Sequence, residues 1–209
     1  MHFKHLDALY NFHLFALAWR FKDLTTTDAW SARLTAFKEK DARALNGACL
    51  VMPYAVSKRK WPEKTFTMVS AIPSAETSLP KTSGLFQLGK AISSTIKWEW
   101  KPELLSKQPH KPLHTIYNAA ERAAEVAGKY SMSHTITTDY VCILDDLITR
   151  GDTMADIVRA IKERNPRVLI FGLVLGKSET HSYVQERGLD INNSQVPADY
   201  AVMWDSAYK

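Results

Sequence analysis

The chain has 209 residues, of which 45% are hydrophobic and 23% charged, and its net charge is +5. This composition excludes a globally disordered chain, and the length fits one domain or one domain with a small appendage. The sequence has no fixed-period repeat and no low-complexity tract, so it is not a solenoid or a fibrous protein. The basic charge suits a phosphate-bearing ligand or a nucleic acid, although a mildly basic protein without either has the same balance.

Two cysteines, Cys49 and Cys142, cannot form a four-cysteine zinc module. Cys142 lies in an apolar run and is expected to be a small buried hydrophobe. This usage favours a reducing compartment, so we expect a cytoplasmic protein. No apolar segment is long enough to cross a bilayer, and Asn11 and His13 interrupt the stretch 8–19 more than a signal peptide allows.

Three helices are predicted in the first third of the chain, where apolar residues recur at helical spacing. The first covers the stretch 8–19 and is expected to be amphipathic. The second is capped by Thr27 or Asp28, and the third begins at Asp41 and runs towards Val51.

A charged segment over 57–64 contains Pro62 and is expected to be a loop or a boundary. We therefore predict a helical N-terminal segment, or hood, over 1–64 and a core over 65–209, both within one compact domain.

The middle of the chain shows both strand and helix patterns. Apolar β-branched runs indicate strands, and apolar residues three and four positions apart indicate helices. In chain order we predict a strand over 66–72 stopped by Pro73, a helix over 85–96, an irregular segment over 97–112 with a short strand near Leu104, and a helix over 117–127 ended by Gly128.

The strongest pattern lies near the C-terminus, where an apolar run over 140–144, a helix over 153–164 and an apolar run over 168–175 follow one another. Strand, helix and strand form a βαβ unit, whose strands are parallel and buried on both faces. The fold class is therefore α/β, with a Rossmann-like central parallel sheet flanked by helices. A last strand is expected over 200–204.

The loop inside this unit carries the candidate site. Asp145 and Asp146 end the strand, and Thr149, Gly151 and Thr153 lead into the helix. Ligands of parallel sheets bind beyond the carboxyl ends of the strands, and a helix N-terminus offers free N–H groups to a phosphate. The two carboxylates are suited to sugar hydroxyls or to a hydrated Mg²⁺ ion.

The thirteen residues 141–153 resemble the phosphoribosyl-pyrophosphate binding motif of type I phosphoribosyltransferases: four apolar residues, two acids, two further residues and Thr-x-Gly-x-Thr. The resemblance implies that fold and a glycosyltransferase activity with Mg²⁺ as cofactor. It implies that Asp145 and Asp146 bind the ribose hydroxyls, directly or with the metal, and that Thr149 to Thr153 wrap the 5′-phosphate.

Two charged positions within the loop depart from its commonest form. Arg150 stands where the family often has a small residue or Thr, although Arg also occurs there in amidotransferase members. Asp152 brings a negative side chain beside a phosphate, so we expect it to point outward or, preferably, to cap the helix.

A closer resemblance, over residues 35–177, is to the ComF (competence protein F) branch of this superfamily. The N-terminal zinc ribbon of that branch has no counterpart in this sequence, which has two cysteines. Four places carry the resemblance in matching order: Phe37–Asp41, Ile72-Pro73, Ser83–Gln87, and Arg122 with Gly128–Tyr130 after it.

The same resemblance implies a pyrophosphate loop after the first core strand, at Pro73 and Ser74, with Lys81 as its nearest base. The Arg and Asn of the branch's Gly-Phe stretch are Ser83 and Phe86 here. Because pyrophosphate needs cations or Mg²⁺ to leave, the sequence predicts binding and leaves turnover open.

Two histidine pairs, His2/His5 and His110/His114, have spacings seen in metal sites, but solvated polar residues are the preferred interpretation. In the segment 97–101, Trp98 and Trp100 alternate with charged residues. They either stack on a nucleic-acid base or pack in an edge strand, and packing is the preferred interpretation.

Lys177 follows the last strand of the βαβ unit and either meets the substrate or is a plain surface lysine.

Two functions remain open at this point. The first is a phosphoribosyltransferase acting on an unknown nucleobase-like or amine acceptor. The alternative is a non-catalytic module that binds phosphoribosyl pyrophosphate or a nucleotide in DNA uptake or processing, as the basic run 58–60 beside Trp61 and the weakened pyrophosphate loop suggest. A homodimer and a nucleic-acid partner are weaker expectations, and no membrane partner is expected.

Overall fold

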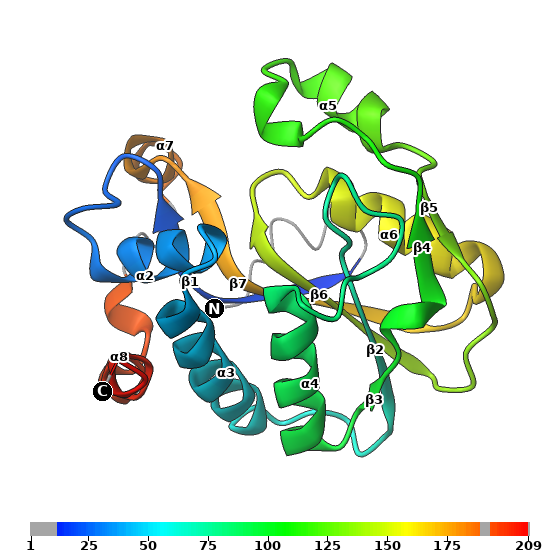
Figure 1. Cartoon of the computed structure of the whole chain (residues 1–209), viewed down its shortest axis with the longest axis horizontal. Helices are drawn as coiled ribbons and strands as arrows, with labels where there is room; N and C mark the ends of the chain where they lie inside the picture. The colour runs from blue at the N-terminus through cyan, green and yellow to red at the C-terminus, as the bar shows by residue number, and fades with distance from the viewer. Residues whose placement is uncertain (1–11, 189–192, 209) are drawn as a thin grey trace.

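A computed structural model describes residues 12–188 and 193–208. Its centre is a five-stranded sheet, all of whose strand pairs are parallel, in the order β1-β7-β6-β2-β3 (Figure 1). The predicted α/β class with a central parallel sheet flanked by helices is confirmed. The strands of this sheet are β1 (His13–Phe21), β2 (Phe66–Ser70), β3 (Glu99–Trp100), β6 (Tyr140–Ile148) and β7 (Leu169–Glu179).

Helices cover both faces of the sheet, and each face has its own buried apolar cluster. One face carries α2 (Ala29–Lys38), α3 (Ala42–Ser57), α4 (Gly84–Ile96) and α8 (Ala198–Ser206). The other carries α5 (Ala119–Val126), α6 (Asp152–Arg164) and a small antiparallel sheet of β4 (Leu105–Lys107) and β5 (Tyr130–Met132). Shorter elements are α7 (His181–Glu186), η1 (Pro102–Leu104), η2 (Leu113–Thr115) and η3 (Asn193–Gln195).

The predicted βαβ unit is confirmed as β6, α6 and β7, with β6 and β7 parallel and adjacent. Both strands are longer than predicted: β6 continues to Ile148 and β7 to Glu179. Because β6 extends past its apolar run, the two acids lie in the last part of a strand and not in a loop.

The predicted first helix is wrong over the part that the structure describes, since His13–Phe21 is strand β1. Residues 8–11 lie outside the described residues. The strand pairs in parallel with β7, with His13 opposite Phe171 and Phe21 opposite Glu179. Its residues are almost continuously buried, so the apparent helical spacing of apolar residues comes from a strand buried on both faces. Residues 13–21 thus belong to the central sheet and not to a helical hood.

The predicted last strand over 200–204 is also wrong, because this segment lies within helix α8. The helix buries Trp204 completely against α3, where the space above Gly47 accommodates the indole ring. A Cβ atom at position 47 would stand 2.6 Å from Trp204 Cδ1. Tertiary packing of one large side chain therefore decides the structure of this short apolar run.

The remaining predicted helices are confirmed with their caps. Asp28 accepts a hydrogen bond from Ser31 N at 2.7 Å at the start of α2, and Asp41 caps α3. Gly128 follows α5 with a φ of 72°, a left-handed conformation that suits glycine.

Cys142 is fully buried, as predicted, and neither cysteine forms a disulfide. Among the described residues, no helix combines the length and the apolar character needed to cross a bilayer.

Candidate functional site

A cleft of about 1160 Å³ opens at the carboxyl ends of the strands. It includes the point between β2 and β6 where the strand order reverses, which is where ligands of open α/β sheets bind. Nine of the ten predicted site residues line it: Pro73, Ser74, Asp145, Asp146, Thr149, Arg150, Gly151, Asp152 and Thr153.

The tenth predicted residue, Lys81, is not among the residues that line the cleft, although Pro80 and Thr82 are. Its side chain is exposed, and its backbone carbonyl accepts a hydrogen bond from Gln87 Nε2 at 3.0 Å. The placement therefore gives no support to Lys81 as a pyrophosphate ligand.

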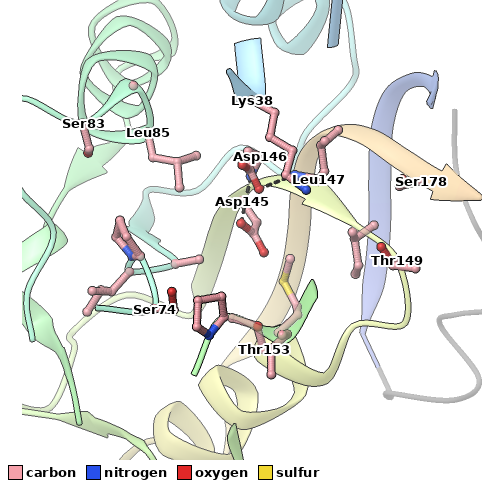
Figure 2. Close-up of a pocket in the computed structure, with 18 of the residues that line it drawn as sticks. Lys38, Ser74, Ser83, Leu85, Asp145, Asp146, Leu147, Thr149, Thr153 and Ser178 are labelled. Atoms are coloured by element: carbon pink, nitrogen blue, oxygen red, sulfur yellow. Dashed lines mark hydrogen bonds between the residues drawn. The ribbon is translucent and has the colours of Figure 1, made fainter. Parts of the chain in front are cut away.

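The carboxylates of Asp145 and Asp146 lie side by side at the end of β6 (Figure 2). Asp146 N donates to Asp145 Oδ1 at 2.8 Å, and Leu147 N donates to Asp146 Oδ1 at 2.6 Å. These backbone bonds fix the orientation of both side chains. They also leave further carboxylate lone pairs for a ligand.

Burial raises the pKa of Asp145 well above its usual value, and the neighbouring charge of Asp146 raises it further. Lys38, from the end of α2, acts in the opposite direction but more weakly. A cation beside the pair would relieve both the desolvation and the repulsion. Two carboxylates fit Mg²⁺, which keeps most of its waters and takes few protein ligands. The described residues contain no group of three or more metal-ligating side chains.

The loop after β6 ends at Gly151, which has a φ of 92° and immediately precedes α6. The prediction that Asp152 caps this helix is wrong: Asp152 is the first helical residue, and Gly151 occupies the capping position without a side chain. In the described structure, no side chain bonds the first N–H groups of α6. These donors and the helix dipole are therefore open to an anion in the cleft.

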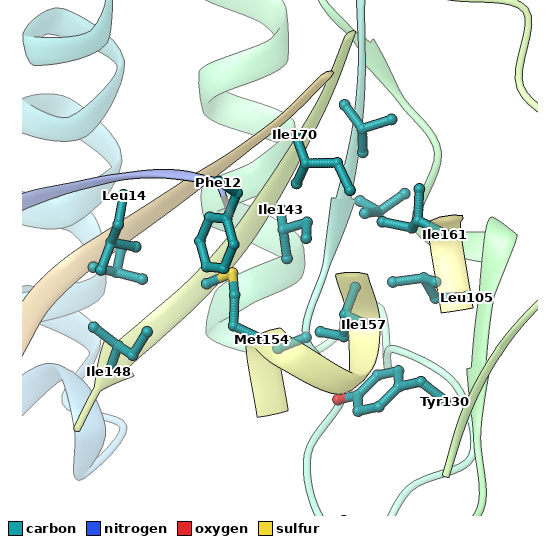
Figure 3. Packing of buried hydrophobic residues seen from close by; sticks show 14 of the residues in the cluster. Phe12, Leu14, Leu105, Tyr130, Ile143, Ile148, Met154, Ile157, Ile161 and Ile170 are labelled. Carbon is teal, nitrogen blue, oxygen red and sulfur yellow. The ribbon is translucent and has the colours of Figure 1, made fainter. Parts of the chain in front are cut away.

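Helix α6 is held in place by its apolar face. Met154, Ile157 and Ile161 are fully buried and pack in the cluster that contains Ile143 and Ile170 of the sheet (Figure 3). Burial of each such side chain is worth about 2 kcal/mol. The start of the helix is thus fixed at the cleft by a rigid core.

Lys177 fits neither of its two sequence interpretations, since it is buried and contacts protein groups. Its Nζ donates to the backbone carbonyl of Thr149 and, at 2.7 Å, to Glu179 Oε1. The lysine of β7 therefore ties the β6 loop to the neighbouring strand. No local pattern signals this role, because Lys177 lies beyond the apolar run, among Gly176, Ser178 and Glu179.

The loop after β2 is held from the other side of the cleft. Ile72 N donates to the hydroxyl of Tyr130 at 2.9 Å, and that hydroxyl donates back to Ile72 O at 3.2 Å. The carbonyl of Ser74 accepts from buried Lys107 Nζ at 2.9 Å and from His110 N at 3.0 Å. Side chains and backbone of the small antiparallel sheet and its following segment therefore fix the course of this loop.

Five cations that sequence reasoning did not place in the site also line the cleft. They come from three segments of the chain, two of which the sequence resemblance included without giving these side chains a role; nothing in the sequence marked the first segment. They are Arg20, Lys22, Lys38, Lys40 and Arg122.

Trp98 and Trp100 pack against the protein, as preferred from the sequence. Trp98 is buried and stacks on Phe66 with ring centroids 4.2 Å apart, and Trp100 lies in edge strand β3. His110 lines the cleft with its Nδ1 2.8 Å from the carbonyl of Lys111. His2 and His5 lie outside the described residues.

No family model matches the sequence, and no curated protein matches it. Among solved structures, the chain is similar to the crystal structure of a hypoxanthine phosphoribosyltransferase from Staphylococcus aureus, at 12% identity and a TM-score of 0.37. The likeness covers 65% of this chain and 73% of that one. A likeness this distant does not indicate a function.

Proposed function

We propose that this protein is a phosphoribosyltransferase that binds 5-phosphoribosyl-1-pyrophosphate with Mg²⁺ and transfers the phosphoribosyl group to an acceptor. The observation that supports this most is the placement of the Asp145–Asp146 pair and the open start of α6 in one cleft. A sugar phosphate needs both, because carboxylates hold hydroxyls or a hydrated metal and N–H groups hold the phosphate.

In this proposal each group of residues that lines the cleft binds one part of the substrate. Residues 149–153 bind the 5′-phosphate, Asp145 and Asp146 bind ribose hydroxyls or Mg²⁺, and Pro73 and Ser74 lie beside the pyrophosphate. The cations that line the cleft make it suited to anionic ligands, and Mg²⁺ would supply the charge that the pyrophosphate loop lacks.

The reaction is a substitution at C1 of the ribose. A nucleophilic nitrogen of the acceptor forms a bond to C1 while the bond from C1 to the pyrophosphate oxygen breaks, and its electron pair leaves with the pyrophosphate. A proton on the attacking nitrogen passes to water. Mg²⁺, when bound, neutralises the leaving group. The protein positions the two reactants and surrounds the developing charge with fixed dipoles.

The alternative, a non-catalytic module for DNA processing, has less support. Two cations of the basic run stack on the protein's own rings: Lys58 Nζ lies 4.7 Å from the centre of Tyr54, and Arg59 Cζ lies 4.5 Å from that of Phe15. The Trp61 indole N–H donates to Val56 O. The run is therefore engaged in packing. Membership of the ComF branch and a homodimer stay predictions from the sequence.

Calorimetric titration of phosphoribosyl pyrophosphate with Mg²⁺ tests the proposal. We expect micromolar binding by the wild type and at least a hundredfold loss in Asp145→Asn/Asp146→Asn. Asp199→Asn, which changes an exposed acid outside the cleft, serves as the matched control and should bind normally. Because burial disfavours the charged form of Asp145, the double variant should melt no earlier than the wild type at pH 7. Absence of binding by the wild type would refute the proposed function.

A further inference from the structure

Four of the cations that line the cleft gather at its β1 end. Arg20 and Lys22 lie at the carboxyl end of β1, Lys38 at the end of α2, and Arg122 on α5. In Figure 1, α5 lies apart from α2, beyond the ends of the central strands. The cluster thus joins three elements that share no local sequence.

These side chains are close enough to influence one another. Burial lowers the pKa of Lys22, Glu179 opposes this effect, and the charges of Arg122, Arg20 and Lys38 lower it further. Nε of Arg122 is buried and has no hydrogen-bond partner among the described residues. Bringing these positive charges together and partly burying them costs free energy. An anionic ligand would offset that cost.

Arg20 has a fixed orientation. Its Nε donates to Thr35 Oγ1 at 3.0 Å and its Nη1 donates to Ser178 Oγ at 3.2 Å. Both partners are neutral hydroxyls, so they position the guanidinium without neutralising its charge. Burial lowers the pKa of Arg20, and the charges of Glu39 and Asp146 oppose this effect through space. A planar, preoriented guanidinium of this kind suits the two oxygens of a carboxylate.

The location of the cluster separates it from the pyrophosphate loop. In the sheet order, β2 lies on one side of β6, and β7 and then β1 lie on the other. Strand β1 is two strand spacings from β6, which is about 10 Å. A ring that carries a carboxylate is of the size needed to reach from the ribose beside β6 towards Arg20.

We propose that the acceptor of this enzyme is a ring compound that carries a carboxylate, bound by Arg20 and Lys22, with Lys38 and Arg122 reinforcing the positive field. The inference rests on the proposed function and adds the chemical class of its second substrate. Arg20 and Lys22 are then specificity-determining residues for the acceptor.

Mononucleotides that differ in one carboxylate provide the test, because each resembles the product of a transfer. Nicotinic acid mononucleotide and nicotinamide mononucleotide differ by a carboxylate against a carboxamide. Orotidine and uridine 5′-monophosphates differ by the presence of a carboxylate. We expect the wild type to bind the carboxylate member of at least one pair about tenfold more tightly in calorimetric titrations.

Arg20→Gln/Lys22→Gln should abolish this preference by weakening the carboxylate member alone. Lys22→Gln by itself, at the exposed end of β1, should reduce the preference and keeps the proposal testable if the double variant does not fold. Lys90→Gln, which changes an exposed lysine of α4 outside the cleft, is the matched control and should retain the full preference. Melting temperatures of all variants check their folding.

Three outcomes would overturn the inference. Equal affinity of the wild type for both members of each pair would show that no carboxylate site exists. A selective loss of Mg²⁺-pyrophosphate binding in the variants would assign the cluster to the leaving group instead. Binding of neither phosphoribosyl pyrophosphate nor any mononucleotide by the wild type would remove the proposed function itself, a result distinct from the first two.

Discussion

The two loops that face each other across the cleft are each held by a lysine that donates to a main-chain carbonyl, but the two lysines have different neighbours. In the β6 loop, Lys177 donates to the carbonyl of Thr149 and is paired with Glu179. In the β2 loop, Lys107 donates to the carbonyl of Ser74, and burial lowers its pKa to about 8, with Glu76 acting in the opposite direction. One loop is thus fixed by an ion pair, and the other by an ammonium group that deprotonates in mildly alkaline solution.

In both loops a buried lysine donates to a main-chain carbonyl, so the course of the backbone depends on a charge inside the protein. Burial lowers the pKa of Lys177 too, but there the hydrogen bond and the charge of Glu179 oppose this effect. The β2 side adds a second anchor, the Tyr130 hydroxyl on Ile72. Three variants or conditions separate these contributions.

Lys177→Met should have the largest effect. It leaves the partly buried Glu179 without its cation and the Thr149 carbonyl without its donor, at a cost of about 2 kcal/mol in the free energy of unfolding. Urea denaturation measures this change, and calorimetry should show weaker binding of phosphoribosyl pyrophosphate. Lys90→Gln is the exposed control. Unchanged stability and affinity would mean that Lys177 does not hold the loop.

Tyr130→Phe should have an intermediate effect, about 1 kcal/mol, because it removes one hydroxyl that both accepts from and donates to Ile72 while keeping the buried ring. Amide hydrogen exchange should increase at Ile72 and remain unchanged in the β6 loop. Faster exchange in both loops would contradict the view that each has its own anchor.

A third effect is expected from pH. The pKa of Lys107 in the folded protein, about 8, is below its ordinary value of 10.5, so the unfolded chain binds more protons between these values. Its contribution to stability therefore rises as pH increases from about 8 to 10.5. Urea midpoints measured across this window should increase more in the wild type than in Lys107→Met. Identical pH profiles would rule out this titration.

The part of the fold that the sequence predicted well is local. The β6–α6–β7 unit is contiguous, and its apolar runs and loop motif all lie between residues 140 and 179. The placement of Asp145, Asp146 and residues 149–153 in the cleft followed from that pattern. The Asp152 cap failed because the left-handed Gly151 takes the capping position.

What the sequence could not predict depends on contacts between distant segments. Strand β1 was mistaken for a helix because only its position beside β7 explains burial on both faces. Arg20, Lys22 and Arg122 meet through the fold alone, so no spacing rule identifies them. The role of Lys177 became visible only with the position of the Thr149 carbonyl.

The pairing of β1 with β7 also has a consequence for how the chain acquires its structure. The two strands pair from His13 opposite Phe171 to Phe21 opposite Glu179, so this sheet edge can close only after residue 179 has been synthesised. Until then, the apolar stretch His13–Phe21 cannot pair with β7 and remains open to aggregation or chaperone binding. Contacts this distant in sequence slow folding, so we expect closure of this edge to be a late event.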